Sequence, residues 1–370
     1  MSNNSEYINT FSHNYCFEEH VSFPLEVIWK QKVSDLHEVI ARPIVVDNKV
    51  YILSSLKGGK GPFSPGILHC LNKETGQIIW EFRINERSGP VSQSCFIENQ
   101  LITSTREGLI GIKNGEKVFQ ISLRERVLSI VPYYNGYIIS THKAVYAIDR
   151  KSNIITIFKG GTRPSTISFE DNYLLFGEKN SLFCFEINDF RLLWEKNVEE
   201  IGKYYDRIGS KTLKKDSYIK GKLRNRYIVI SKDYIFCCVG IKMICLNLKS
   251  GKEIWKGDAM GDPVVSNNKV YSYCETGNFF CLNAADGNKQ YNKIPATIRG
   301  LTVSLPFVSG NIFFVCANKI LAINIDNGNL FWEFQSNIKD TLFFDPVFLN
   351  GRVYVGCSDG YIYCFGHNIK

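Results

Sequence analysis

Residues 68–80 read LHCLNKETGQIIW, and the same pattern returns as MICLNLKSGKEIW at 243–255 and as ILAINIDNGNLFW at 320–332. Each copy contains an apolar run, an Asn, a turn closed by Gly, and a second apolar run that ends in Trp. Weaker copies occupy residues 109–121, 145–157, 182–194 and 279–291. The pattern predicts pairs of antiparallel strands that are joined by tight turns.

A small residue stands in the first strand of every copy, and a large apolar or aromatic residue follows ten positions later. The small residues are Cys70, Gly111, Ala147, Cys184, Cys245, Cys281 and Ala322. Their partners are Trp80, Ile121, Ile157, Trp194, Trp255, Tyr291 and Trp332. We expect the small residue to let the next sheet approach closely, and the ring to fill the gap between the sheets.

The ends of the chain complete the repeat. Residues 361–365 form an eighth first strand with Cys364 at the small position, and no aromatic partner follows it. Residues 25–29 supply an aromatic strand that ends in Trp29 and has no first strand before it. Two more strand-like runs precede each motif, so each unit of about 40 residues contains four strands.

The chain is therefore predicted to be all-β, an eight-bladed β-propeller whose ring is closed by the N-terminal strand pairing with the last blade. Residues 1–23 are expected to form a partly disordered arm, and residues 24–370 a single propeller. A basic insert near residues 198–225 is expected between blades 4 and 5. The predicted structural docking residues, buried between blades, are Trp29, Trp80, Trp194, Trp255 and Trp332.

The repeat, with its Asn or Asp, its Thr-Gly or Ser-Gly and its Trp, resembles the tryptophan-docking repeat of the pyrroloquinoline-quinone (PQQ) type propellers over roughly residues 24–366. That family includes quinone-dependent alcohol dehydrogenases and a non-enzymatic eight-bladed lipoprotein of bacterial outer-membrane assembly. The chain resembles the lipoprotein more than the dehydrogenases. The resemblance implies the fold and says little about chemistry.

The quinone site of the dehydrogenases, with its calcium ligands and its disulfide between adjacent cysteines, is not carried over by the resemblance. The one adjacent pair, Cys237 and Cys238, lies in a run typical of a buried strand, where neighbouring side chains point to opposite faces. No set of residues matches the calcium ligands, no CxxC pair occurs, and no GxSxG or HExxH motif is present. We predict no cofactor, no metal site and no catalytic residues. The six histidines have no ligand spacing, and the strand pattern predicts that His69 faces a blade surface.

Composition is typical of a globular chain, with 44% hydrophobic and 22% charged residues. No apolar run approaches the roughly 18 residues of a membrane span, and residues 1–19 lack the features of a secretory signal. Without an export signal, the 12 cysteines fit a reducing compartment, in which thiols act as small apolar residues. These features predict a cytoplasmic protein that binds no membrane, and the family resemblance implies a bacterial one.

Most of the net charge of +8 is concentrated in one stretch, because residues 203–226 contain nine basic and two acidic residues, a net charge of +7. This insert is a crossover between blades, and the loop at residues 57–66 joins a second strand to a third, so both are expected on one propeller face. The candidate partner-binding residues are Lys57, Lys60, Lys203, Tyr204, Tyr205, Arg207, Lys211, Lys214, Lys215 and Tyr218. A solvated loop without a partner is the alternative.

The sequence favours a non-catalytic protein-interaction scaffold or adaptor that binds an acidic protein partner, of unknown identity, through this face. A nucleic-acid or acidic-surface binder that uses the basic insert is the second interpretation, and it predicts affinity that falls steeply with salt. A quinone-dependent or other enzyme is the third and least favoured.

Overall fold

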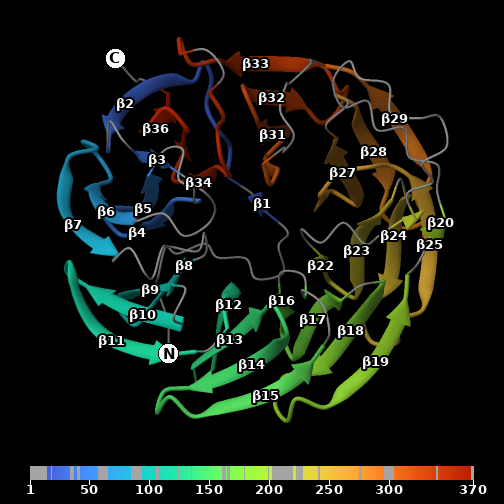
Figure 1. Cartoon of the computed structure of the whole chain (residues 1–370). Helices are drawn as coiled ribbons and strands as arrows, with labels where there is room; N and C mark the ends of the chain where they lie inside the picture. The colour runs from blue at the N-terminus through green and yellow to red at the C-terminus, as the bar shows by residue number, and fades with distance from the viewer. Residues whose placement is uncertain are drawn as a thin grey trace, which may run out of the picture.

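The computed structural model of the chain describes residues 15–17, 19–33, 37–39, 42–56, 66–84, 94–105, 108–123, 125–134, 136–160, 164, 167–178, 180–198, 200–201, 220–221, 228–240, 242–274, 277–295, 304–338 and 341–367. Within these ranges every regular element is a β-strand, and no helix is long and apolar enough to cross a membrane. The strands of the described residues form eight sheets of four or five strands, arranged as the blades of a ring, and one further sheet of two strands (Figure 1). The predicted eight-bladed propeller is confirmed.

The first four blades follow each other along the chain. Blade 1 contains β3 (His37–Val39), β4 (Ile44–Val46), β5 (Lys49–Leu56), β6 (Gly66–Asn72) and β7 (Ile78–Ile84). Blade 2 contains β8 (Ser94–Ile97), β9 (Gln100–Thr105), β10 (Gly108–Lys113) and β11 (Glu116–Ser122). Blade 3 contains β12 (Val127–Tyr133), β13 (Gly136–Thr141), β14 (Ala144–Asp149) and β15 (Ile154–Lys159). Blade 4 contains β16 (Ser168–Glu170), β17 (Tyr173–Glu178), β18 (Ser181–Glu186) and β19 (Leu192–Asn197).

The last four blades include two strands from the N-terminal region. Blade 5 contains β22 (Val229–Ser231), β23 (Tyr234–Val239), β24 (Lys242–Asn247) and β25 (Glu253–Asp258). Blade 6 contains β26 (Pro263–Ser266), β27 (Lys269–Tyr273), β28 (Phe279–Asn283) and β29 (Lys289–Lys293). Blade 7 contains β1 (Cys16–Phe17), β30 (Phe307–Ser309), β31 (Ile312–Cys316), β32 (Ile320–Asn324) and β33 (Leu330–Phe334). Blade 8 contains β34 (Val347–Leu349), β35 (Arg352–Gly356), β36 (Tyr361–Gly366) and β2 (Glu26–Lys32).

Strand β2 closes the ring as predicted. It pairs antiparallel with β36, and Trp29 lies opposite Cys364. The outermost strand of blade 8 thus comes from the N-terminal region, whereas the other three strands come from the C-terminal region. With β2 in place, blade 8 and blade 1 meet without a gap. Buried residues of the two blades share one hydrophobic cluster that includes Val50, Leu71 and Tyr354.

Alternation of antiparallel strands gives the ring two distinct faces. In each blade the turns between the first and second strands and between the third and fourth strands lie on the same side, which we call the turn face. The loops between second and third strands, and the crossovers to the next blade, lie on the other side, which we call the crossover face. Among the described residues, one cluster of buried hydrophobic side chains fills each of the eight interfaces between neighbouring blades.

The aromatic position of the repeat joins each blade to the next one. Trp255 of blade 5 donates its indole N–H to the carbonyl oxygen of Ala284 in blade 6, at 2.8 Å. A Cβ added at Gly287 would lie 2.5 Å from the ring, so the turn needs glycine there for the ring to fit; its φ of +72° also favours glycine. Trp29 and Trp194 make the equivalent indole bonds to the next blade, at 3.0 and 2.9 Å.

Burial of the five tryptophans is more varied than the sequence analysis expects. Trp29 and Trp255 are buried, with 9% and 7% of their surface exposed, whereas Trp80, Trp194 and Trp332 are only partly buried. All five tryptophans stand on the outermost strands of their blades. There the next blade covers one side of the indole ring and leaves the other side near the solvent. The small residue lies directly across from the ring on the neighbouring strand of the same blade, as Cys245 does opposite Trp255.

Candidate functional site

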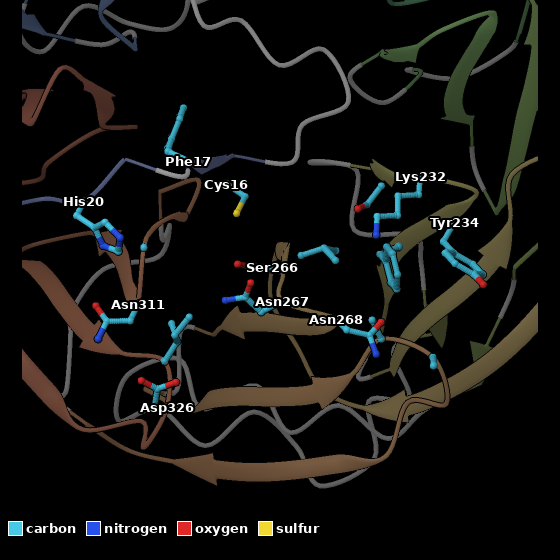
Figure 2. A pocket seen from close by; sticks show the side chains of 17 residues that line it. Cys16, Phe17, His20, Lys232, Tyr234, Ser266, Asn267, Asn268, Asn311 and Asp326 are labelled. Atoms are coloured by element: carbon cyan, nitrogen blue, oxygen red, sulfur yellow. The ribbon is translucent and has the colours of Figure 1, made fainter.

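A hollow of about 710 Å³ opens on the turn face, over blades 5, 6 and 7. Hairpin turns of the three blades line it with Ser231, Lys232 and Tyr234, with residues 266–268 and with residues 310–311. The N-terminal segment, by which we mean residues 15–17 and 19–23, adds Cys16, Phe17 and His20 to its wall (Figure 2). We call this feature the turn-face hollow. A concave site of this kind can take a ligand or a partner.

Tight hairpins fix the side chains that line the hollow. Asn267 and Asn268 have φ values of 49° and 58°, as a two-residue type I′ turn between β26 and β27 requires. Asn tolerates this left-handed conformation because its short side chain bonds locally to the backbone. In blade 5, Lys232 also has a positive φ, of 57°. Such short turns fix the backbone positions from which the lining side chains project.

The hollow combines polar groups with apolar surface. Figure 2 shows His20, Asn311 and Asp326 on one side and Lys232 and Tyr234 on the other. Amide side chains provide hydrogen-bond donors and acceptors together, so they can pair with either group of a polypeptide backbone. Tyr234 is 38% exposed, and its ring centroid lies 6.4 Å from that of Phe236. The hollow therefore offers hydrogen-bonding groups and an exposed aromatic ring to a bound molecule.

The predicted partner-binding residues lie outside the described residues. They are Lys57, Lys60, Lys203, Tyr204, Tyr205, Arg207, Lys211, Lys214, Lys215 and Tyr218. The described part of the insert consists of β20 (Glu200–Ile201) and β21 (Lys220–Gly221), which pair antiparallel between β19 and β22 in chain order. The turn-face hollow lies on the face opposite to the crossovers between blades.

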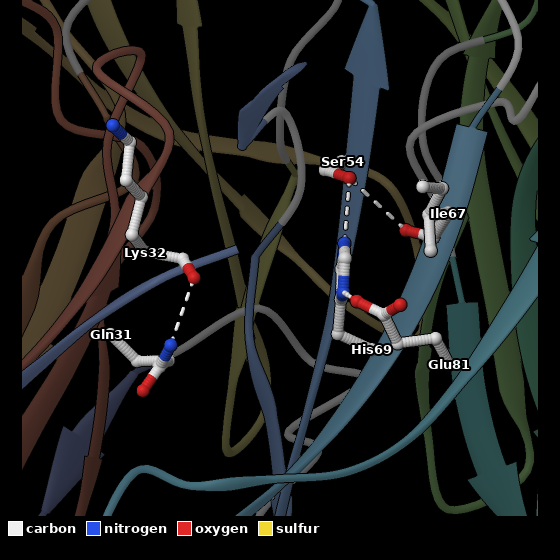
Figure 3. Close-up of polar contacts among 6 residues, drawn as sticks. All are labelled: Gln31, Lys32, Ser54, Ile67, His69 and Glu81. Atoms are coloured by element: carbon white, nitrogen blue, oxygen red, sulfur yellow. Dashed lines mark hydrogen bonds and ion pairs between the residues drawn. The ribbon is translucent and has the colours of Figure 1, made fainter. Parts of the chain in front are cut away.

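A second polar cluster joins three strands of blade 1. Ser54 Oγ and His69 Nε2 are 2.8 Å apart, and His69 Nδ1 lies 2.7 Å from Glu81 Oε1 (Figure 3). Each ring nitrogen of His69 thus faces one polar partner, and Ser54 Oγ also donates to the Ile67 carbonyl oxygen at 3.3 Å. This order of serine, histidine and carboxylate is that of a hydrolase triad.

Burial gives the blade 1 cluster a structural role. Ser54 and His69 are both 0% exposed, so a substrate carbonyl has no access to Ser54 Oγ. The polar groups instead satisfy one another across β5, β6 and β7. Local strand alternation predicts His69 on a blade surface, but its side chain is completely buried. Its two partners stand on neighbouring strands, so the alternation along one strand cannot reveal them.

The adjacent cysteines are separated by the sheet that carries them. Cys237 packs into the interface between blades 4 and 5, and Cys238 into the interface between blades 5 and 6.

Burial raises the pKa of the thiols of Cys184 and Cys245 to about 12, which keeps them protonated. Among the residues that the structure describes, no three His, Cys, Asp or Glu side chains are grouped to hold a metal ion.

Sequence reasoning missed the residues of the turn-face hollow. The sequence SNN at 266–268 has a clear signal, but that signal indicates a turn. Nothing in the linear chain brings His20, Lys232 and Asn311 together, since their proximity depends on the ring order of blades 5 to 7 and on the path of the N-terminal segment.

Solved structures share this fold. BamB from Moraxella catarrhalis superimposes with a TM-score of 0.69 and 12% identity, over 93% of this chain and 100% of that chain. Quinohemoprotein alcohol dehydrogenase from Comamonas testosteroni gives a TM-score of 0.67 and 11% identity, over 92% of this chain and 76% of that one. At such identities the likeness shows the propeller fold alone.

Curated relatives match shorter stretches. The outer membrane protein assembly factor BamB of Escherichia coli strain K12 is 31% identical over 103 residues, which are 27% of this chain and 25% of that protein. The protein of the same name from Legionella pneumophila strain Paris is 24% identical over 138 residues, or 33% of this chain and 35% of that protein. The matches thus span about a quarter to a third of the relatives' length.

These relatives contradict the predicted cytoplasmic location, which is wrong: their name ties them to outer-membrane assembly. The prediction relied in part on the cysteine count. Eleven of the 12 cysteines are buried, and Cys16 is partly exposed, so the count reflects packing between blades rather than a redox compartment.

The family model described as outer membrane protein assembly factor BamB matches residues 178–367, which is more than half of the chain. The matched region runs from the end of β17 in blade 4 to the end of blade 8, and includes most of the described lining of the turn-face hollow. The chain belongs to the outer membrane protein assembly factor BamB family.

Proposed function

We propose that this chain is a non-catalytic scaffold that binds a protein partner in outer-membrane protein assembly. Family membership supports the scaffold role, and the names of the relatives supply the process. The single observation that carries the proposal is the turn-face hollow of about 710 Å³, built from the turns of three neighbouring blades.

The chemistry of the hollow fits a polypeptide ligand. Ser231, Asn267 and Asn311 offer hydroxyl and amide groups that match backbone N–H and C=O groups. Tyr234 supplies an exposed aromatic ring, the residue type that most often anchors a protein contact. Because the turns are held by strand pairing on both sides, binding costs little ordering entropy.

The basic insert is a second candidate contact, carried by the charge of +7 over residues 203–226. It would recruit an acidic protein surface on the crossover face by electrostatic steering. Reversing the charge at Lys211, Lys214 and Lys215 should then slow association and leave folding intact. The nucleic-acid alternative predicts instead that affinity for nucleic acid falls steeply with salt.

Site-specific photo-crosslinking in native membranes tests the proposal. Tyr234 is replaced by p-azidophenylalanine, which preserves the ring, and Lys214 carries the same group in a second variant. Ile155 on β15, which is 51% exposed and far along the ring, is the matched control position. We expect one discrete crosslinked protein of outer-membrane assembly at Tyr234.

The outcomes separate the two candidate surfaces. A crosslink at Lys214 alone would reject the turn-face hollow in favour of the insert. Labelling at Tyr234 no stronger than at Ile155, together with none at Lys214, would reject the scaffold role at both surfaces.

A further inference from the structure

The N-terminal segment binds the propeller as a peptide ligand binds a sheet edge. Strand β1 pairs in parallel with β30, the strand of blade 7 nearest the ring axis, and lies inside the ring in Figure 1. The amide of Val308 donates to the Tyr15 carbonyl at 2.8 Å, and the amide of Gly310 donates to the Phe17 carbonyl at 3.2 Å. Addition of an extended segment to an exposed strand edge is a common mode of peptide recognition.

Two aromatic side chains of the segment enter the interface between blades 7 and 8. Tyr15 and Phe17 are 5% and 8% exposed and belong to its hydrophobic cluster. The Phe17 ring centroid lies 6.0 Å from that of Phe307 and 5.4 Å from that of Phe348. The Arg42 guanidinium stands 3.9 Å over the Tyr15 ring, a cation–π contact. The groove thus has one place for each of two rings that are two residues apart.

The residue between the rings points the other way. Cys16 packs against the cluster between blades 6 and 7 and lines the turn-face hollow (Figure 2). Alternate side chains of a strand face opposite sides, so a segment in this place presents two rings to one interface and one small side chain to the other. The segment in the groove therefore has the order aromatic, small, aromatic along residues 15–17.

Polar contacts hold the segment where it leaves the groove. Ser309 Oγ donates to the Glu19 carbonyl at 2.5 Å and accepts from the amide of Val21 at 3.2 Å. The His20 ring covers Gly310, where an added Cβ would meet its Nδ1 at 2.0 Å. These contacts fix the parallel direction and the register of the bound segment.

The pairing is short compared with the blades that surround it. Strand β1 contributes two residue pairs to β30, whereas β31 and β32 share five. Local openings draw on the least supported elements of a fold, so we expect the segment to open more readily than the longer strand pairs of blade 7.

We propose that the groove between blades 7 and 8 recognises an extended segment of a partner polypeptide that carries two aromatic side chains separated by one small residue. Residues 15–17 of this chain occupy the groove in the structure and compete with the partner. The inference rests on the proposed function and deepens it by naming the kind of polypeptide that is bound. Its test uses a synthetic peptide, so it can fail while the crosslinking at Tyr234 succeeds.

Fluorescence anisotropy of a labelled peptide with the sequence of residues 13–23 measures the recognition. The peptide is titrated with the full-length chain, with Tyr15→Ala/Phe17→Ala, and with Ile154→Ala/Ile155→Ala, which removes two exposed apolar side chains from β15. A tethered segment competes at an effective concentration in the millimolar range. We expect the Tyr15→Ala/Phe17→Ala variant to bind the peptide at least ~10-fold more tightly than the other two proteins.

A peptide with Ala at both ring positions is the matched control and should lose this binding. Equal binding of the two peptides, or no gain in the Tyr15→Ala/Phe17→Ala variant with its strand circular dichroism intact, would overturn the proposal. If the peptide binds only to dimers of this chain, the proposal would also be overturned, because a second copy of the chain would then occupy the groove.

Hydrogen exchange of the wild-type chain keeps the proposal testable if that variant does not fold. The amides of Val308 and Gly310 should exchange at least ~10-fold faster than the amide of Ala322 in the centre of the same blade. Equal rates would mean that the segment opens only when the blade unfolds, and would reject an exchangeable ligand.

Discussion

Removing the ring of Trp255 tests the contact that joins one blade to the next. The ring is 7% exposed, lies against Gly287 and bonds to the Ala284 carbonyl at 2.8 Å. Trp255→Ala leaves a cavity between blades 5 and 6 and a carbonyl without its donor. Large-to-small changes of this kind cost about 3–5 kcal/mol of unfolding free energy. Trp255→Phe keeps most of the ring and loses the hydrogen bond, so we expect a loss of about 1–2 kcal/mol.

Urea unfolding followed by circular dichroism measures both losses. Ile254→Ala on the same strand is the matched control, since its side chain is 42% exposed and its loss should change stability by about 0.5 kcal/mol or less. The comparison requires a single transition with an unchanged denaturant slope. The docking account is refuted if Trp255→Ala costs no more than Ile254→Ala, or no more than Trp255→Phe.

The remaining predictions concern ring closure, a half-buried carboxyl group and a buried histidine. Trp29→Ala should cost about 3 kcal/mol despite its place near the chain end, because the ring seals blade 8 against blade 1; an unchanged melting temperature would refute this closure. Burial raises the pKa of Glu170 from 4.5 to about 7, and its Oε2 has no hydrogen-bond partner among the described residues. The folded state therefore holds the proton more tightly, and stability from this group falls as pH rises from 4.5 to 7. In thermal melts, Glu170→Gln should stabilise the chain by about 1 kcal/mol at pH 8, after discounting for the half-exposed side chain, and should have almost no effect at pH 4.5. The control Glu195→Gln, at an exposed position, should show no such pH dependence. His69→Ala should cost about 2–3 kcal/mol in urea unfolding, because it leaves Ser54 and Glu81 without their partner; a loss below about 0.5 kcal/mol would contradict the structural role of this cluster.

The fold could be predicted in detail from the sequence because its repeat is local. Strand, turn and strand recur with a small residue and a ring ten positions apart, and the incomplete motifs at the two ends have only each other as partners. The pairing of Trp29 with Cys364 follows from that count. The burial of individual rings could not be predicted, since it depends on how far the next blade covers an outermost strand.

The candidate site could not be predicted because it is assembled from distant turns. Lys232, Asn268 and Asn311 each stand in a hairpin that is locally complete, and only the ring brings these hairpins around one hollow. Residues 1–23 are predicted to form a partly disordered arm, of which the described part includes the buried residues Tyr15 and Phe17. The predicted basic surface lies outside the described residues and remains a prediction.

Binding of the crosslinked partner by variants of the two faces tests the central claim most directly. Biolayer interferometry compares the wild-type chain with Tyr234→Ala/Asn311→Ala on the turn face and with Lys211→Glu/Lys214→Glu/Lys215→Glu on the insert. If the turn-face hollow is the docking site, the turn-face variant should bind at least ~10-fold more weakly, chiefly through faster dissociation, while it melts like the wild type. Unchanged affinity of the turn-face variant for that partner would contradict the account.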